Sequence, residues 1–85
     1  MINQTKVFED MKVWILQMKD IEEDKISIHS NFIQLGFDSL DFVEIEFNIR
    51  KDYGVGLNHE LIALKKIVNI NDLIKYIIFE SNATN

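Results

Sequence analysis

The hydrophobic positions of residues 5–19 predict the first helix of the chain. Five apolar residues of this segment, Val7, Met11, Trp14, Ile15 and Met18, form a regular series. They recur at i, i+4, i+7, i+8 and i+11, which places them on one face of an α-helix. Thr5 is the expected N-cap. The charged side chains, including Lys19 after the stripe, are expected to be exposed.

Residues 39–53 predict a second helix with two apolar faces. One set consists of Phe42, Ile45, Ile49 and Tyr53, and the other of Leu40, Val43 and Phe47. At about 100° per residue, the two sets lie on nearly opposite faces. A small chain cannot easily cover both faces, so we expect the first set in the core and the second as an exposed strip that marks an interaction site. The alternative is that a folded-back loop covers the strip.

Glycine and asparagine residues indicate where the other helices begin and end. Gly54 is expected to end the second helix in the left-handed conformation, after which Val55 and Leu57 return to the core. Asn58 is the expected cap of a short helix over residues 59–65. Asn71 is the expected cap of the last helix, with Asp72 in its first turn. The expected contacts are Leu61, Ile62 and Leu64 in the short helix and Leu73, Ile74, Ile77 and Ile78 in the last. Residues 81–85 are expected to fray.

Residues 20–37 form a long connection between the first two helices. A connection of this length is usually functional or anchored, and six of its apolar residues are the expected anchors. These are Ile21, Ile26, Ile28, Phe32, Ile33 and Leu35. The sequence therefore predicts an all-α fold: a small four-helix bundle with three longer helices, one short helix and a long loop between the first two helices.

The composition limits what the chain can do. We expect a single domain, residues 1–85, because hydrophobic residues make up 47% of the chain, enough for a globular core. There is no cysteine, so thiol chemistry has to come from an attached group. The net charge of −5 argues against nucleic acid or an anionic membrane as partner and favours basic protein surfaces. Without a signal-peptide pattern or a membrane-spanning run, a cytoplasmic monomer is expected.

The segment before the second helix carries the most specific chemistry. Gly36 breaks the chain, Asp38 is a good N-cap, and Asp41, three residues on, matches the acidic member of a capping box. Ser39 is then the first helical residue, with its hydroxyl available for other use. The first turn of a helix has unpaired N–H groups and a partial positive charge, so a phosphate on Ser39 is favoured. Taken alone, these residues also fit a loop that simply ends in a helix cap.

The wider pattern around Ser39 resembles the acyl carrier protein family over roughly residues 7–78. The matching residues are Leu35-Gly36-Phe37-Asp38-Ser39-Leu40-Asp41, Val43-Glu44, Tyr53-Gly54-Val55 and the helix from Ile70 to Ile77. The resemblance implies a carrier without catalytic residues. Its 4′-phosphopantetheine arm, derived from coenzyme A, would be attached to Ser39 beside Asp38 and would hold an acyl or aminoacyl group as a thioester. The implied partners are a phosphopantetheinyl transferase, a loading enzyme, and synthases or transferases with basic docking surfaces.

The resemblance also implies which residues contact those partners. Leu40, Val43 and Phe47 are the implied apolar contacts, and Asp41 and Glu44 the charged ones. Complementary charge of this kind mainly speeds encounter and sets orientation.

Four residues of the second helix depart from the family's usual pattern. Arg50 and Lys51 stand where many carriers remain acidic, which argues against recognition by the generic enzymes of fatty acid synthesis. Phe42 is bulky and Glu46 polar beside the expected core, so both are expected to shrink or polarise a cavity between the helices. We therefore expect that a long fatty chain is not buried in the bundle.

Several functions remain open at this point. The favoured one is a carrier for a specialised polyketide, nonribosomal peptide or lipid pathway, acting as a discrete protein. The alternatives are a housekeeping carrier of fatty acid synthesis and a helical interaction module without the arm. A hydrolase or transferase with Ser39 as nucleophile would need a base, and His29 and His59 lie in no recognisable motif. Neither His29 nor the acidic run of residues 22–24 indicates a metal site.

Overall fold

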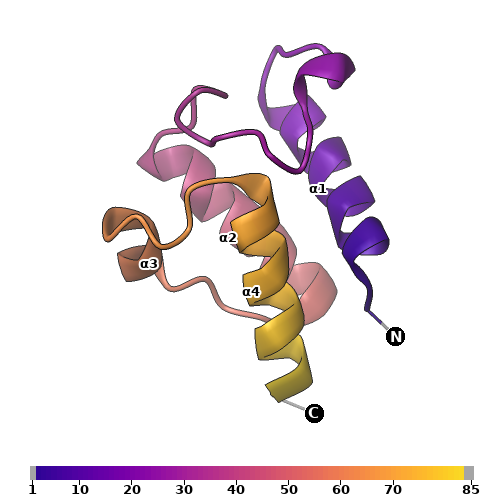
Figure 1. Cartoon of the computed structure of the whole chain (residues 1–85), viewed down its shortest axis with the longest axis vertical. Coiled ribbons are helices and arrows are strands. Elements are labelled where there is room, and N and C mark those ends of the chain that lie inside the picture. Colours follow the sequence, from indigo (N-terminus) through magenta and orange to yellow (C-terminus); the bar gives the residue numbers. More distant parts are fainter. Residues whose placement is uncertain (1, 84–85) are drawn as a thin grey trace.

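The computed structural model describes residues 2–83 and is helical in the way the sequence predicts. Its elements are α1 (Gln4–Met18), the 3₁₀ turn η1 (Glu23–Lys25), α2 (Ser39–Tyr53), α3 (His59–Ala63) and α4 (Ile70–Ala83) (Figure 1). Three helices are long, one is short, and a long loop joins α1 to α2, so the predicted fold class is confirmed. Within residues 2–83 the only β-type pairing is one antiparallel bridge between Asn31 and Asn69.

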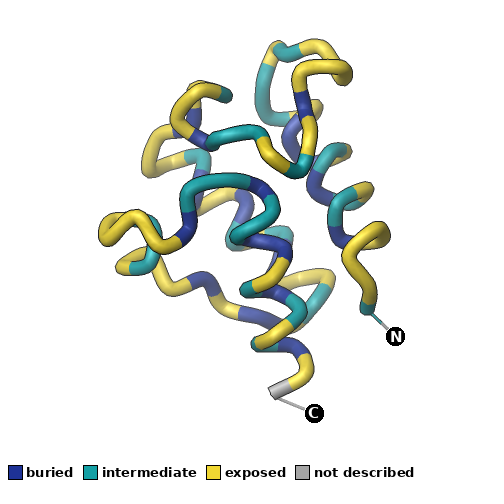
Figure 2. The backbone as a smooth tube through the Cα atoms, in the orientation of Figure 1, coloured by how far each residue is buried: buried dark blue, intermediate teal, exposed yellow. Residues whose placement is uncertain are grey.

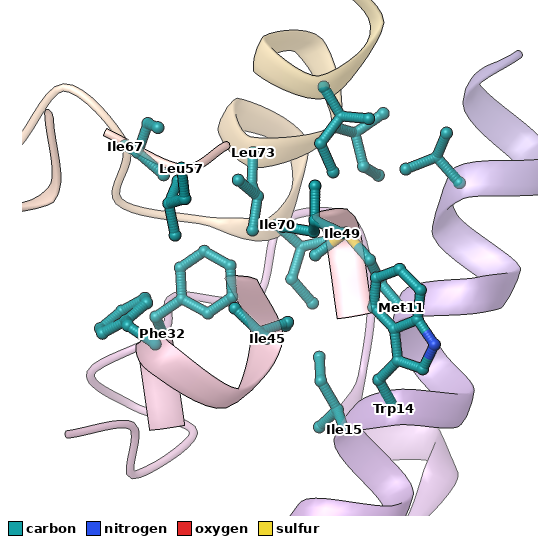
Figure 3. Close-up of a cluster of buried hydrophobic side chains, with 14 of the residues drawn as sticks. Met11, Trp14, Ile15, Phe32, Ile45, Ile49, Leu57, Ile67, Ile70 and Leu73 are labelled. Atoms are coloured by element: carbon teal, nitrogen blue, oxygen red, sulfur yellow. The ribbon is translucent and has the colours of Figure 1, made fainter. Parts of the chain in front are cut away.

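The three long helices pack against one another in pairs, and α3 lies to one side of them (Figure 1). Buried positions line the inward sides of the helices, whereas the loop after α1 and the end of α3 are mostly exposed (Figure 2). In the core, Met11 and Ile15 of α1 face Ile45 and Ile49 of α2 (Figure 3). The stripe residues predicted for α1 and α4 are buried or partly buried, so helical periodicity identified the core correctly.

The N-caps of two helices lie earlier than predicted. The Asn3 side chain, not Thr5, caps α1 and accepts a hydrogen bond from the Lys6 N–H at 2.9 Å. Asn69, not Asn71, caps α4: its Oδ1 accepts from the Asp72 N–H at 2.8 Å, and the Asp72 carboxylate accepts from the Asn69 N–H at 3.2 Å. Asn69 is the better cap because Asp72 is then the third helical residue, and its carboxylate can accept a hydrogen bond from the N–H of the cap residue.

The segment after α2 has most of the features predicted for it. Gly54 has φ 70° and ends α2 in the left-handed conformation, Val55 and Leu57 are buried, and Asn58 caps α3. However, α3 ends at Ala63 rather than at residue 65, so that the predicted contact Leu64 is exposed.

A change of chain direction after α3 explains the exposed Leu64. Lys65 has φ 60°, and the N–H groups of Lys66 and Ile67 both return to the carbonyl of Leu61. This turn brings Ile67, instead of Leu64, into the core.

The connection between α1 and α2 is anchored, although one expected anchor is wrong. Ile26 and Phe32 are buried, whereas Ile33 is exposed. The Phe32 N–H donates to the Val68 carbonyl at 3.0 Å, and the Ile33 N–H is bound by the Asn31 side chain at 2.8 Å. These bonds fix a turn that directs Phe32 inward and its neighbour outward.

The end of α4 is more ordered than predicted. The helix continues to Ala83, and Ser81 is buried because it lies one turn beyond Ile77 on the inward face. Residues 84 and 85, for which fraying was also predicted, lie outside the described part of the chain. Across residues 2–83, none of the helices combines the length and the apolar character needed to cross a membrane.

Candidate functional site

The start of α2 is built around a reciprocal pair of aspartates. The Asp38 Oδ1 accepts from the Asp41 N–H at 3.0 Å, and the Asp41 Oδ2 accepts from the Asp38 N–H at 3.0 Å. This is the predicted capping box. Ser39 is the first residue of α2 and is exposed. Its hydroxyl therefore faces solvent at the positive end of a 15-residue helix.

Lys19 joins this site from the end of α1. Its Nζ donates to the Gly36 carbonyl at 2.8 Å and lies 2.6 Å from the Asp41 Oδ2. The same ammonium lies 5.8 Å from the centre of the Phe37 ring, within range of a cation–π contact. The hydrophobic pattern of α1 predicts Lys19 as an exposed charge. That is wrong, because its side chain is only 23% exposed.

The electrostatics of Asp41 reflect these contacts. Burial by itself raises the pKa of the Asp41 carboxyl, but hydrogen bonds from Lys19 and from the Asp38 backbone outweigh it, so the pKa lies below its ordinary value. Asp41 is thus ionised and internally paired, with a side chain 19% exposed. Its neighbour Glu44 is exposed and presents its charge to solvent.

Three phenylalanines pack against one another below the start of α2. Phe32 from the connection, Phe37 from the turn before Ser39 and Phe42 from α2 have ring centroids 5.0–5.3 Å apart. All three are buried. A pocket of about 390 Å³ opens beside them, lined by Phe32, Phe42 and residues of the loop after α3. The aromatic cluster therefore forms one wall of the pocket and occupies the space behind it.

The predicted exposed strip is present on the outer face of α2. Leu40, Val43 and Phe47 are 76%, 56% and 65% exposed, and no loop of the described chain buries them. Val43 and Phe47 also line a small hollow of about 230 Å³ together with Glu46 and Arg50. The strip begins next to Ser39 and runs along the helix toward the basic residues at its end.

Glu46 connects α2 to the segment before α3. Its carboxylate pairs with the His59 Nε2 at 2.7 Å and the Arg50 Nη2 at 2.6 Å, and accepts from the Leu57 N–H at 3.2 Å. The hydrogen bond with His59, followed by that with Arg50, holds the pKa of Glu46 below its ordinary value. Glu46 was expected to polarise a cavity. Instead it faces residues 57–59 and does not line the larger pocket.

The histidines of the described residues are not placed to activate Ser39. His59 is engaged by Glu46, and among residues 2–83 neither histidine hydrogen-bonds Ser39. In the same range, no group of three or more histidine and acidic side chains is placed to hold a metal ion. An exposed hydroxyl at the N-terminus of a helix is in a position where an attached phosphate group would be favoured.

Comparison with known proteins agrees with this geometry. Residues 15–77 match the family described as the phosphopantetheine attachment site. The acyl carrier protein of Helicobacter acinonychis (strain Sheeba) is 32% identical over 72 residues, which cover 84% of this chain and 90% of that protein. The acyl carrier protein of Helicobacter pylori (strain G27) is 33% identical over the same shares of both chains.

The chain therefore belongs to the acyl carrier protein family. Members of the family are carriers and not catalysts, and the attachment site implies a 4′-phosphopantetheine prosthetic group. The family also implies a phosphopantetheinyl transferase and acyl-handling enzymes as partners.

The sequence predicted the start of α2 at Ser39, the cap at Asp38 and the exposure of the strip, but it did not reveal the contacts of Lys19 or the burial of Phe37. Lys19 follows the last helical residue of α1 and meets its partners 17 and 22 positions further along the chain, so no local pattern could reveal the contact. Phe37 belongs to the motif itself, and its burial becomes apparent only when Phe32 and Phe42 are brought together.

Proposed function

We propose that Ser39 carries the 4′-phosphopantetheine arm and that the protein presents an acyl or aminoacyl thioester on it to partner enzymes. The observation that supports this most directly is the exposure of Ser39 as the first residue of a capped helix. The Ser39 Oγ forms the phosphodiester, and the helix N-terminus and the Lys19 ammonium favour the added negative charge. The arm supplies the thiol that this cysteine-free chain lacks.

Transfer of a fluorescent coenzyme A analogue tests the assignment of Ser39. A broad-specificity phosphopantetheinyl transferase should label the wild-type protein, and Ser39→Ala should remain unlabelled. Ser30→Ala is the matched control because Ser30 lies in the connection before α2, and it should be labelled normally. Labelling of Ser39→Ala would place the arm on another residue.

We propose that partner enzymes dock on Leu40, Val43 and Phe47. Three large apolar side chains exposed in one strip are unusual on a protein surface and are typical of an interaction site. Asp41 and Glu44 flank the strip, but Asp41 shares its charge with Lys19. Glu44 is therefore the main acidic contact available to a basic partner surface, and its charge mainly speeds encounter.

We propose that the cargo belongs to a specialised polyketide, nonribosomal peptide or lipid pathway and remains outside the bundle. The support comes from the cluster of Phe32, Phe37 and Phe42, which fills the space next to the pocket. A long acyl chain would have to displace these rings from well-packed positions, and such displacement is costly. The alternative is a housekeeping carrier of fatty acid synthesis, which would take a long chain into the bundle.

Chemical shifts distinguish these two possibilities. The ¹H–¹⁵N spectra of the protein bearing a bare arm and a long acyl arm should differ only near Ser39 and the pocket mouth. Phe42→Ala, which removes one ring of the cluster, is the positive control that should admit more of the chain. Shifts throughout α1 and α4 of the wild-type protein on acylation would contradict the proposal.

We further propose a cytoplasmic location, because coenzyme A, the donor of the arm, is an intracellular metabolite. Fractionation of producing cells, with detection of the arm-bearing form, tests this. Recovery of that form mainly outside the cytoplasm would contradict it.

A further inference from the structure

Lys19 touches both sides of the segment that presents Ser39. It is the first residue after α1, and its own N–H donates to the Ile15 carbonyl at 2.8 Å, which fixes its backbone to the helix end. From there its Nζ reaches the Gly36 carbonyl, three residues before Ser39, at 2.8 Å. The same Nζ reaches the Asp41 carboxylate, two residues after Ser39, at 2.6 Å.

These contacts restrain the turn on which Ser39 depends. Gly36 has φ 83°, a conformation that favours glycine and lets the chain reverse before α2. The Asp41 carboxylate that pairs with Lys19 also accepts from the Asp38 N–H at 3.0 Å. One ammonium thus ties the turn, the cap and the first turn of α2 to the end of α1.

The same ammonium changes the charge around the attachment residue. Asp38 and Asp41 place two carboxylates within two residues of Ser39. Both carboxylates oppose an incoming anionic donor and a bound phosphodiester, since neighbouring like charges repel each other. An ammonium 2.6 Å from the Asp41 carboxylate offsets one of these charges while leaving the capping bonds in place.

We propose that Lys19 is a positioning residue for attachment of the arm: it fixes the orientation of Ser39 through Gly36 and Asp41 and compensates the carboxylate charge beside it. This inference rests on Ser39 being the attachment residue. It identifies a basic residue of the carrier itself, outside α2 and outside the motif around Ser39, as a determinant of the modification rate.

A purely structural role is the competing explanation, and Lys12 provides the matched control. Lys12 also lies on the α1 side of the protein, with a side chain 20% exposed against 23% for Lys19. Its Nζ lies 3.3 Å from the Glu23 carboxylate and 5.3 Å from the centre of the Phe8 ring. Lys12→Met therefore removes the same charge, a carboxylate contact and a ring contact, without touching residues 36–41.

The test is the steady-state rate of arm transfer from coenzyme A to the purified carrier by a phosphopantetheinyl transferase. Lys19→Met should lower kcat/KM for the carrier roughly tenfold, mostly through kcat, because misplacing a reacting group slows the chemical step. Lys19→Arg keeps a charged donor for the carboxylate and should recover the rate to within about threefold. Lys12→Met should match the wild type.

Two further measurements separate positioning from loss of fold. The pKa of the Asp41 carboxyl, followed by NMR, should rise in Lys19→Met and stay unchanged in Lys12→Met. Asp41→Asn should also slow transfer, because the loss of the link between Lys19 and α2 outweighs the removal of one repelling carboxylate. The double variant Lys19→Met/Asp41→Asn should be no slower than the slower single variant, because the two residues act as one unit. Each variant is first shown to be helical by circular dichroism.

Three outcomes overturn the proposal. They are wild-type rates in Lys19→Met, equal losses in Lys19→Met and Lys12→Met, and no recovery in Lys19→Arg. A wild-type protein that accepts no arm from a transferase active on another carrier would instead refute the assignment of Ser39, and the proposal about Lys19 with it.

Discussion

Replacing Glu46 by glutamine should destabilise the protein in a pH-dependent way. The Glu46 carboxylate is 17% exposed and pairs with the side chains of Arg50 and His59, which are 65% and 45% exposed. Glutamine has nearly the same shape and still offers an oxygen to the Leu57 N–H. The substitution therefore removes mainly the charge of the carboxylate and leaves the geometry of α2 intact.

The size of the effect follows from these exposures. Water screens both partners: the ion pair with Arg50 contributes roughly 0.2–1 kcal/mol, and the hydrogen bond with His59, which is an ion pair only when His59 is protonated, contributes about 0.5–1.5 kcal/mol. The expected loss at pH 7 is then about 1 kcal/mol, equivalent to a fall in Tm of about 4–8 °C for a domain of this size. The control is Glu44→Gln, which removes the same charge from an exposed position on the same helix. It should change the free energy of unfolding by less than about 0.5 kcal/mol.

The pH dependence gives the sharper test. Because the folded-state pKa of Glu46 lies below its ordinary value, its stabilising contribution is fully present above a pKa of about 4.3, the value for an unfolded chain. That contribution is lost as the pH falls through the folded-state pKa. Urea unfolding at several pH values should therefore show the wild type and Glu46→Gln converging in strongly acidic solution. A difference that stays constant between neutral and strongly acidic pH would refute this reasoning.

Three other substitutions test separate parts of the structure. Asn69→Ala should destabilise the fold by about 1 kcal/mol through loss of a cap, whereas Asn71→Ala should cost less than about 0.5 kcal/mol in urea unfolding; equal costs would contradict the cap assignment. Tyr53→Phe removes a hydrogen bond to the Asp10 carboxylate. It should cost about 0.5–1.5 kcal/mol and raise the pKa of Asp10 measured by NMR, and an unchanged titration would count against that bond. Phe47→Ala should leave thermal stability nearly unchanged while slowing transfer of the arm, and a large fall in Tm would show that Phe47 belongs to the core.

Local sequence signals were sufficient for the presence of the four helices and for both ends of α2, but not for the starts of α1 and α4 or the end of α3. The start of α2 follows from Asp38 and Asp41 three residues apart, and its end from Gly54, because caps depend on neighbours within one turn. The two faces of α2 follow from periodicity alone. The exposed strip was therefore predictable before any tertiary contact was known.

Contacts between distant segments account for what the sequence did not reveal. Phe32 and Ile33 are adjacent and similarly apolar, and the bond from Phe32 to the Val68 carbonyl selects which one is buried. Glu46 meets His59 across 13 positions, and Lys19 meets Asp41 across 22. Such pairings arise only when the helices pack together. Those of Phe32 and Lys19 lie next to the segment that carries Ser39.

Intact mass spectrometry shows whether Ser39 carries the 4′-phosphopantetheine arm. The wild-type protein and Ser39→Ala are incubated with coenzyme A and a phosphopantetheinyl transferase shown to be active on another carrier. We expect the wild-type mass to rise by a single phosphopantetheine unit, fragmentation to place this unit on Ser39, and the variant to gain nothing. An unmodified wild-type protein, or an equal gain in Ser39→Ala, would contradict this expectation.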